Sequence, residues 1–269
     1  MAERSETYTH GHADSVLRSH RWRTVDNSAA YLIPHLRPGI ELLDVGCGPG
    51  TITIDLAARV APGRVLGIDA ADDAIAAAQA AAAEDGVANL EVRVADVYAL
   101  DLPDESFDVV HAHQVLQHLA DPVAALREMR RVCRPDGVVA VRDCVYGAMS
   151  WYPDEPGIDR WLEVYDTVAL ANGGEPDAGN RLVAWAQAAG FSSVTASASA
   201  WCYATPEERR WWGDLWADRT SATALADRAV ELEVATRAEL ADIADAWRRW
   251  AAHDDAVFLV PCGELIATP

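Results

Sequence analysis

One short stretch constrains the fold of this 269-residue chain more than any other: Glu41 to Thr51, which reads ELLDVGCGPGT. A short apolar run ends in Asp44, and three glycines, Gly46, Gly48 and Gly50, then alternate with other residues. A helical pattern of apolar residues follows directly. Glycines in a turn permit positive φ angles and let the backbone approach a ligand closely. A strand, a glycine turn and a helix N-terminus in this order predict a nucleotide-binding cradle.

The spacing of the glycines separates two kinds of cradle. Dinucleotide-binding folds use G-x-G-x-x-G, whose third glycine lies within the start of the helix. Here the pattern is Asp-x-Gly-x-Gly-x-Gly, with an acid just before the turn. A glycine motif alone is a weak signal, so a bare glycine turn in some other α/β protein stays open at this point.

Acidic residues follow two of the next predicted strands. Asp69 ends the strand predicted at 64–69, where a carboxylate can accept hydrogen bonds from both hydroxyls of a ribose. Asp96 follows the strand predicted at 90–94, where it suits the exocyclic amine of adenine, with the backbone N–H of Val97 reaching a ring nitrogen. The alternative role for Asp96 is to cap a turn or a helix.

Strands and helices alternate through the first half of the chain. Strands are predicted at 40–45, 64–69, 90–94, 107–112, 138–141, 193–202 and 256–266. Helical patterns separate most of the early ones, and this alternation predicts a parallel, doubly wound α/β sheet.

Charge and composition exclude several classes of protein. The chain is 51% hydrophobic, which is typical of a globular protein, and its formal net charge is −20. It contains no lysine, so a Schiff-base mechanism, which needs a lysine amine, is excluded. Proteins that bind nucleic acid usually carry a basic patch. None is visible here, so no nucleic-acid partner is expected.

Cysteine usage and hydropathy bear on location. The five cysteines are scattered and never spaced as C-x-x-C, which predicts reduced thiols and neither a disulfide framework nor a metal site. The N-terminal stretch is too polar for a signal peptide, and no apolar run reaches the ~18 residues that a membrane span needs. We therefore expect a cytoplasmic protein. The oligomeric state is left open, with a homodimer as one expectation.

Five motifs occur in order along the chain: LDVGCGPGT, GIDA, VADV, FDVVHAHQVLQHLADP and RRVCRPDGVVAVRD. As a set they resemble class I S-adenosylmethionine (SAM) dependent methyltransferases, in the branch that includes the ubiquinone and menaquinone C-methyltransferases. The leader HRWRT is similar to the N-terminal cap of that branch. The resemblance implies a seven-stranded Rossmann-like sheet in the order 3-2-1-4-5-7-6, whose strands six and seven form an antiparallel edge.

The resemblance also implies cofactor-binding roles in the core. The backbone of Gly46 and Gly48 would run alongside the amino-acid portion and the ribose of SAM. Asp69 would bind the ribose hydroxyls. Asp96 and Val97 would hold adenine.

Three further residues would contact the methionine end of SAM. His113 falls where a small polar residue after strand four makes this contact in the family, and a histidine departs from the usual serine or asparagine. Tyr8 and Arg23, from the cap, would close over the SAM carboxylate.

The second half of the chain is rich in large aromatics. Nine of the ten tryptophans come after residue 150. Such side chains build apolar pockets, and they can equally pack insertions onto a sheet. We expect an N-terminal helical cap at 1–38, a SAM-binding core at 39–145, and the remainder of the same fold at 146–269. That remainder would contain substrate-covering helical insertions at 147–176 and 205–253.

Methyl transfer depends on alignment and on exclusion of water more than on acid chemistry. If the acceptor is a phenol, an amine or an enol carbon, a base helps to remove a proton. The candidates near the carboxyl ends of strands four and five are His118, Asp143 and Tyr146. The alternative for His118 is a structural histidine bonded to backbone, and Asp143 could instead cap a turn.

The predicted function is a SAM-dependent methyltransferase of secondary metabolism. Its acceptor is predicted to be a small apolar or aromatic molecule with an O, N or C nucleophile. Three alternatives stay open: a SAM-binding enzyme with another reaction such as cyclisation, a non-catalytic SAM-binding partner, and an NAD-dependent oxidoreductase.

Overall fold

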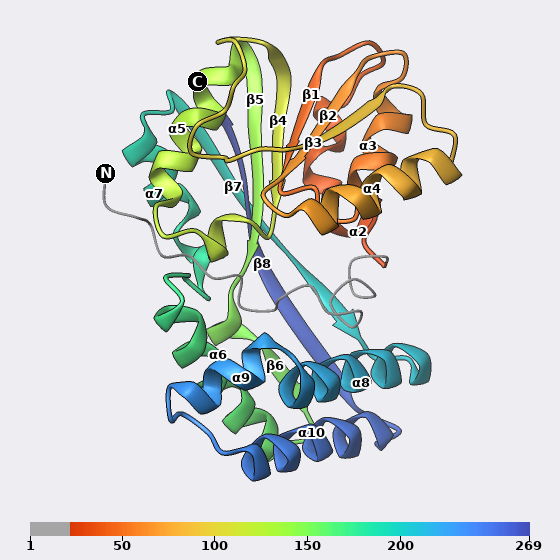
Figure 1. Cartoon of the computed structure of the whole chain (residues 1–269), viewed down its shortest axis with the longest axis vertical. Coiled ribbons are helices and arrows are strands. Elements are labelled where there is room, and N and C mark those ends of the chain that lie inside the picture. The colour runs from red at the N-terminus through yellow and green to blue at the C-terminus, as the bar shows by residue number, and fades with distance from the viewer. Residues whose placement is uncertain (1–21) are drawn as a thin grey trace.

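The computed structural model describes residues 22–269, which form an eight-stranded mixed sheet with helices on both faces (Figure 1). The strands are β1 (Leu42–Val45), β2 (Val65–Asp69), β3 (Leu90–Val94), β4 (Phe107–His113), β5 (Cys133–Cys144), β6 (Ser150–Tyr152), β7 (Ser193–Tyr203) and β8 (Val257–Thr268). Their order is β3-β2-β1-β4-β5-β8-β6, with β7 paired to the other edge of β8.

The predicted strand order is confirmed. The strands predicted sixth and seventh are β7 and β8, and β8 runs antiparallel to both β5 and β7. Strand β6 was not predicted. It pairs antiparallel with the start of β8, where Trp151 lies opposite Phe258. Three residues are too few to show the alternation of apolar and polar side chains by which a strand is recognised.

α-Helices and short 3-10 helices connect these strands. The α-helices are α2 (Val25–Ser28), α3 (Thr51–Val60), α4 (Asp72–Glu84), α5 (Pro122–Val132), α6 (Pro156–Ala171), α7 (Leu182–Ala189), α8 (Pro206–Ala222), α9 (Ala224–Glu231) and α10 (Arg237–Ala252). Short 3-10 turns are η1 (Ala30–His35), η2 (Leu116–His118), η3 (Tyr146–Ala148) and η4 (Ala178–Asn180).

Alternating side chains of the central strands build the two layers around the sheet. In β1, Leu42 belongs to the buried cluster formed with α2, η1 and α3, whereas Leu43 belongs to the cluster formed with α5 and α7. In β4, Val109 belongs to the same cluster as Leu42, and Val110 belongs to the same cluster as Leu43. Successive side chains of a strand point to opposite faces, so a strand that is apolar at every position must be covered on both sides.

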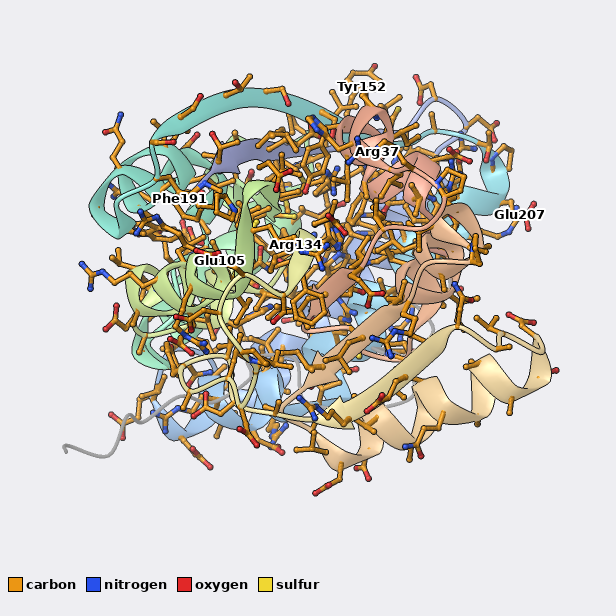
Figure 2. The ribbon with its side chains drawn as sticks, turned by 90° about the horizontal axis from the view of Figure 1, so that it is seen from above. Arg37, Glu105, Arg134, Tyr152, Phe191 and Glu207 are labelled. Atoms are coloured by element: carbon orange, nitrogen blue, oxygen red, sulfur yellow. The ribbon has the colours of Figure 1, made fainter. Side chains whose placement is uncertain are left out.

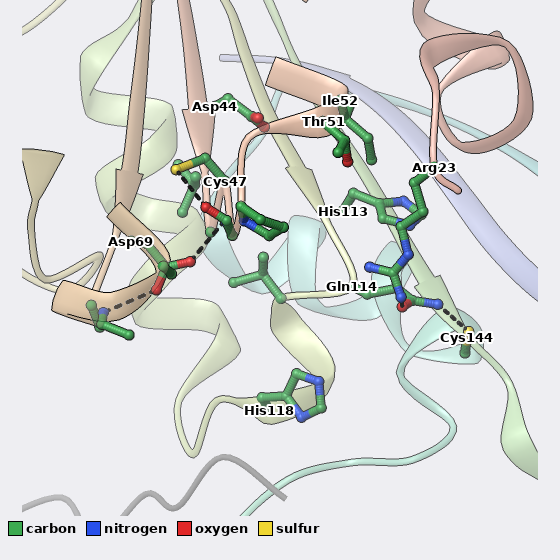
Figure 3. Close-up of a pocket in the computed structure, with 18 of the residues that line it drawn as sticks. Arg23, Asp44, Cys47, Thr51, Ile52, Asp69, His113, Gln114, His118 and Cys144 are labelled. Atoms are coloured by element: carbon green, nitrogen blue, oxygen red, sulfur yellow. Dashed lines mark hydrogen bonds between the residues drawn. The ribbon is translucent and has the colours of Figure 1, made fainter. Parts of the chain in front are cut away.

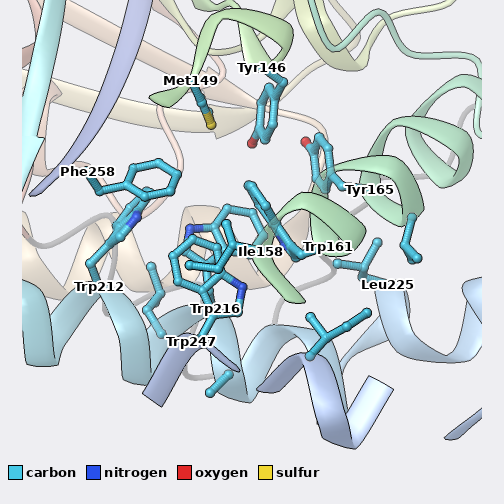
Figure 4. Packing of buried hydrophobic residues seen from close by; sticks show 14 of the residues in the cluster. Tyr146, Met149, Ile158, Trp161, Tyr165, Trp212, Trp216, Leu225, Trp247 and Phe258 are labelled. Atoms are coloured by element: carbon cyan, nitrogen blue, oxygen red, sulfur yellow. The ribbon is translucent and has the colours of Figure 1, made fainter. Parts of the chain in front are cut away.

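A third cluster forms away from the parallel strands, where α6, α8, α9 and α10 gather around the far ends of β6 to β8 (Figure 1). Figure 4 shows its centre, in which Trp161, Trp216 and Trp247 pack together beside Phe258. Helices α8 and α10 each begin at a threonine in a capping box, Thr205 and Thr236, which satisfies free N–H groups of the first turn. Residues predicted as insertions thus pack on one another as well as on the sheet.

Seen from above, Glu207 at the start of α8 lies at the outer edge of the molecule (Figure 2). Within residues 22–269, no helix combines the length and the apolar character that crossing a membrane requires.

Candidate active site

A cavity of about 590 Å³ lies at the carboxyl ends of β1, β2, β3 and β4. Its opposite wall comes from β7, from helix α8 and from the N-terminal residues Trp22 and Arg23. Carboxyl ends of parallel strands meet at one edge of the sheet, which is where α/β folds place their ligands. The cavity therefore joins the predicted cradle to the aromatic second half of the chain.

The glycine turn forms one end of the cavity (Figure 3). Gly46, Gly48 and Gly50 all have positive φ, at 67°, 54° and 88°. A Cβ at Gly46 would overlap Cγ2 of Val115, and the backbone N–H of Gly48 donates to Oδ2 of Asp69 at 3.0 Å. The turn thus requires glycine for both conformation and space.

Two acids hold the cradle in shape. The Oδ1 atom of Asp69 accepts from the Ala71 N–H at 3.0 Å, so this carboxylate is fixed at the end of β2 and faces the cavity. Asp44 is buried, and its two oxygens bond Thr53 Oγ1 at 2.6 Å and His111 Nδ1 at 2.7 Å. Asp44 therefore connects β1 to α3 and β4, which makes the turn rigid.

The structure also brings Asp96, Val97 and His113 to this cavity. Oδ1 of Asp96 accepts from the Tyr98 N–H at 2.9 Å, so the carboxylate caps a turn while it lines the cavity. His113 is buried, and its ring centroid lies 5.6 Å from that of Trp201. The cofactor-binding roles of these three residues stay predictions.

Arg23 reaches the cavity from the N-terminal segment (Figure 3). Its Nη2 donates to Oε1 of Gln114 at 2.5 Å, and Nε2 of Gln114 donates to the Cys144 sulfur. Arg23 is therefore anchored at the end of β4, beside His113. Tyr8, its predicted companion, lies outside the described residues.

The predicted bases divide between two environments. His118 and Tyr146 line the cavity, whereas Asp143 is fully buried outside its lining. Oδ1 of Asp143 accepts from the Gln117 N–H at 3.1 Å, and Gln117 lies beside His118 on η2. The geometry thus favours a positioning role for Asp143, through the η2 turn, over direct contact with an acceptor.

Burial also changes the protonation of these groups. It lowers the pKa of His118 to about 3, with the charges of Arg23 and Arg219 acting in the same direction. Burial raises the pKa of Tyr146 well above its usual value. At neutral pH the imidazole is therefore neutral and the phenol keeps its proton, so both can form hydrogen bonds but neither is a strong base.

Asp143 leads to a prediction about stability and pH. Burial raises the pKa of Asp143 to about 7, while an unfolded aspartate ionises near ~3.9. Between these values the folded state holds a proton that the unfolded state has lost, so the contribution of this group to stability falls as pH rises through the window. Asp143→Asn should flatten this slope. The total loss of unfolding free energy across the window should become smaller by on the order of 1–4 kcal/mol, as measured by urea unfolding at several pH values. Exposed Asp136→Asn on the same strand should leave the slope as it is, and an unchanged slope for Asp143→Asn would contradict the assignment.

Several cavity residues were not among the predicted site residues: Trp22, Gln114, Cys144, Trp201, Tyr203 and Arg219. For Arg219, the sequence does contain a pattern that could have indicated its place in the cavity. Trp212, Trp216 and Arg219 follow one another at intervals of four and three on α8, which places them on one helix face, and all three line the cavity. Trp201 is brought in by pairing of distant strands, and its Nε1–H donates to the Asn27 carbonyl at 2.6 Å.

A family model described as a methyltransferase domain matches residues 36–190. The chain belongs to the methyltransferase-domain family. It is 32% identical over 267 residues to an uncharacterized methyltransferase of Schizosaccharomyces pombe, a match that covers 96% of this chain and 95% of the relative. The protein is thus a SAM-dependent methyltransferase, and its cofactor is SAM.

Solved structures show the same fold. The YcgJ protein of Bacillus subtilis matches with a TM-score of 0.60 at 18% identity, over 89% of this chain and 96% of that one. A phosphoethanolamine N-methyltransferase of Haemonchus contortus, in complex with S-adenosylhomocysteine, matches with a TM-score of 0.55 at 16% identity, over 89% and 51% of the two chains. The cradle of the present chain fits the cofactor, because Gly46 and Gly48 leave their backbone open to the cavity and the fixed carboxylate of Asp69 faces it.

Proposed function

We propose that this enzyme transfers the methyl group of SAM to a small apolar or aromatic molecule, through an O, N or C nucleophile of the acceptor. The observation that carries the proposal is the continuity of the cavity. It extends from the glycine turn to an aromatic wall in which Trp211, Trp212 and Trp216 face the same space as Asp69. A planar apolar acceptor would bury its faces against these rings.

The residues of the cradle would hold the donor as the family resemblance implies. Gly46 and Gly48 allow close approach of the backbone, Asp69 accepts from the ribose hydroxyls, and Asp96 and Val97 bind adenine. These carboxylates stand at the ends of neighbouring parallel strands, so the sheet itself sets the distances between them. Fixed donors and acceptors reduce the reorganisation that the reaction would otherwise need.

When bound, SAM supplies a methyl group whose bond to sulfur breaks as the acceptor atom bonds the methyl carbon, and the electron pair of the broken bond stays on sulfur. The chain's part is to orient the acceptor and to exclude water. His118 and Tyr146 border the same cavity, and both can hydrogen-bond an acceptor without exchanging a proton at neutral pH. The acceptor's proton, where there is one, would therefore leave to solvent before the acceptor binds.

Two measurements test this function. Calorimetry should show that the purified enzyme binds SAM and S-adenosylhomocysteine but not NADH. Turnover against a library of aromatic and apolar metabolites should then release one S-adenosylhomocysteine for each acceptor that gains a methyl mass. Binding of SAM with conversion of an acceptor but no release of S-adenosylhomocysteine would overturn methyl transfer in favour of another reaction such as cyclisation.

A further inference from the structure

The charged groups that line the cavity are segregated. Three carboxylates, those of Asp44, Asp69 and Asp96, lie at the ends of β1, β2 and β3. The two arginines of the lining, Arg23 and Arg219, lie on the other side, with the aromatic wall. Among the described residues, no carboxylate lines that aromatic side. Two guanidinium groups thus border the same space as the aromatic wall.

Arg23 has a position that suits the cofactor. Its bond to Gln114 holds the guanidinium directly after β4, next to His113. Its guanidinium carbon also lies 5.4 Å from the centroid of the Trp201 ring, and Arg142 lies 4.6 Å from the same ring. Held in this way at the strand ends, Arg23 lies where the carboxylate of the cofactor is expected.

Arg219 lies deeper in the aromatic wall. It is 5% exposed, and its guanidinium carbon is 5.2 Å from the centroid of the Trp216 ring. Arg219 lines the same cavity as His118 and Tyr146, the two polar groups of the aromatic side. A guanidinium presents a rigid set of N–H donors that matches carboxylates and other anionic oxygens.

We propose that the acceptor is an aromatic molecule bearing an anionic oxygen, and that Arg219 binds this oxygen while the indole rings of α8 contact the aromatic body. This inference rests on the proposed methyl transfer and names its substrate class. Arg23 and Arg219 then have separate partners, the first on the cofactor and the second on the acceptor.

The protonation of the site agrees with this substrate class. The low pKa of His118 and the raised pKa of Tyr146 leave the aromatic side without a strong base. An acceptor that is already ionised at neutral pH does not need one. The anionic oxygen could belong to a carboxylate beside the reacting atom, or to a phenolate or enolate that is itself the nucleophile.

Matched pairs of probes test the proposal in the presence of saturating S-adenosylhomocysteine. One arm compares benzoate, 2-naphthoate and indole-3-acetate with their neutral amides by calorimetry. The other arm titrates 4-nitrophenol, which absorbs visible light only as the phenolate. We expect at least one acid to bind about tenfold more tightly than its amide, or the nitrophenolate to be bound in preference to the phenol. The first result identifies a carboxylate acceptor and the second an acidic hydroxyl.

Variants of α8 show whether Arg219 is responsible. Arg219→Gln should remove the preference for the anion and leave S-adenosylhomocysteine affinity within about twofold, whereas Arg219→Lys should keep part of the preference. Exposed Arg210→Gln on the same helix is the matched control and should behave as the wild type. Melting temperatures of all three variants establish that they are folded.

Three results would overturn the inference. The first is equal affinity for every acid and its amide, together with no preference for the nitrophenolate over the phenol. The second is a preference for the anion that survives Arg219→Gln. The third is a loss of S-adenosylhomocysteine binding in Arg219→Gln. The last would assign this arginine to the cofactor. If the wild type binds neither SAM nor S-adenosylhomocysteine, the proposed function itself fails, and this outcome is distinct from the other three.

Discussion

Replacing Gly46 by alanine is expected to lower the affinity for SAM by more than about 100-fold. The φ of Gly46 is 67°, and a side chain in this region costs roughly 1 kcal/mol. The added Cβ would also overlap Val115 Cγ2, so the turn must move, and the turn is the surface that the ligand approaches. Calorimetric titration of SAM into the purified variant measures the loss.

The chain offers a matched control for this substitution. Gly86 has nearly the same φ, 65°, but nothing lies within 4 Å of an added Cβ, and it does not line the cavity. Gly86→Ala should lose only the stability that the backbone conformation costs, because no overlap adds to it, and it should bind SAM as the wild type does. Adding Val115→Ala to Gly46→Ala removes the overlapping methyl and should recover part of the affinity. Equal binding by the Gly46 and Gly86 variants would show that the turn does not contact the cofactor.

Replacing Asp69 by asparagine is expected to lower SAM affinity about 10- to 100-fold. The carboxylate already accepts from the backbone N–H groups of Gly48 and Ala71, and its remaining lone pairs face the cavity where a ribose diol would donate. Hydrogen bonds to a charged group contribute roughly 1.5–3 kcal/mol, which corresponds to this range of affinity. An amide has one oxygen in place of two, so it cannot serve the backbone and both hydroxyls together.

Exposed Asp73 at the start of α4 provides the comparison, since Asp73→Asn makes the same chemical change away from the cavity. It should bind SAM normally, and the melting temperatures of the two variants should be close. Wild-type affinity in Asp69→Asn would remove Asp69 from the cofactor site. Weakened binding in both variants would indicate a general effect of charge.

The glycine turn and the strand-end acids of the cavity were predictable because they depend on local sequence. A strand, a glycine turn and a helix form one continuous segment from Leu42 to Val60. An acid at the end of a parallel strand can lie only at the carboxyl edge of the sheet, which is where Asp69 and Asp96 are found. The alternation of strand and helix patterns likewise predicted a parallel, doubly wound sheet, whereas the strand order was implied only by the resemblance to class I SAM-dependent methyltransferases.

The acceptor half depends on contacts between residues that are distant in sequence. Whether a tryptophan lines the cavity or fills the core is set by the packing of α8 against α6 and α10. Trp212 belongs to the buried cluster and also lines the cavity, while Trp247 belongs to the buried cluster alone. Asp143 and Tyr146 are close in sequence, yet the structure separates their surroundings. Tyr146 lines the cavity, whereas Asp143 is buried beside η2.

The sequence by itself therefore determined the strands, the parallel first half of the sheet and the glycine turn that borders the cavity, because turn conformation and strand patterning are local properties. The tertiary structure alone decided which tryptophans border the cavity, that β6 joins the sheet, and that Arg219 lies beside the ring of Trp216. The physical reason is that a side chain's surroundings are set by long-range packing, which the periodicity of a single helix or strand does not contain.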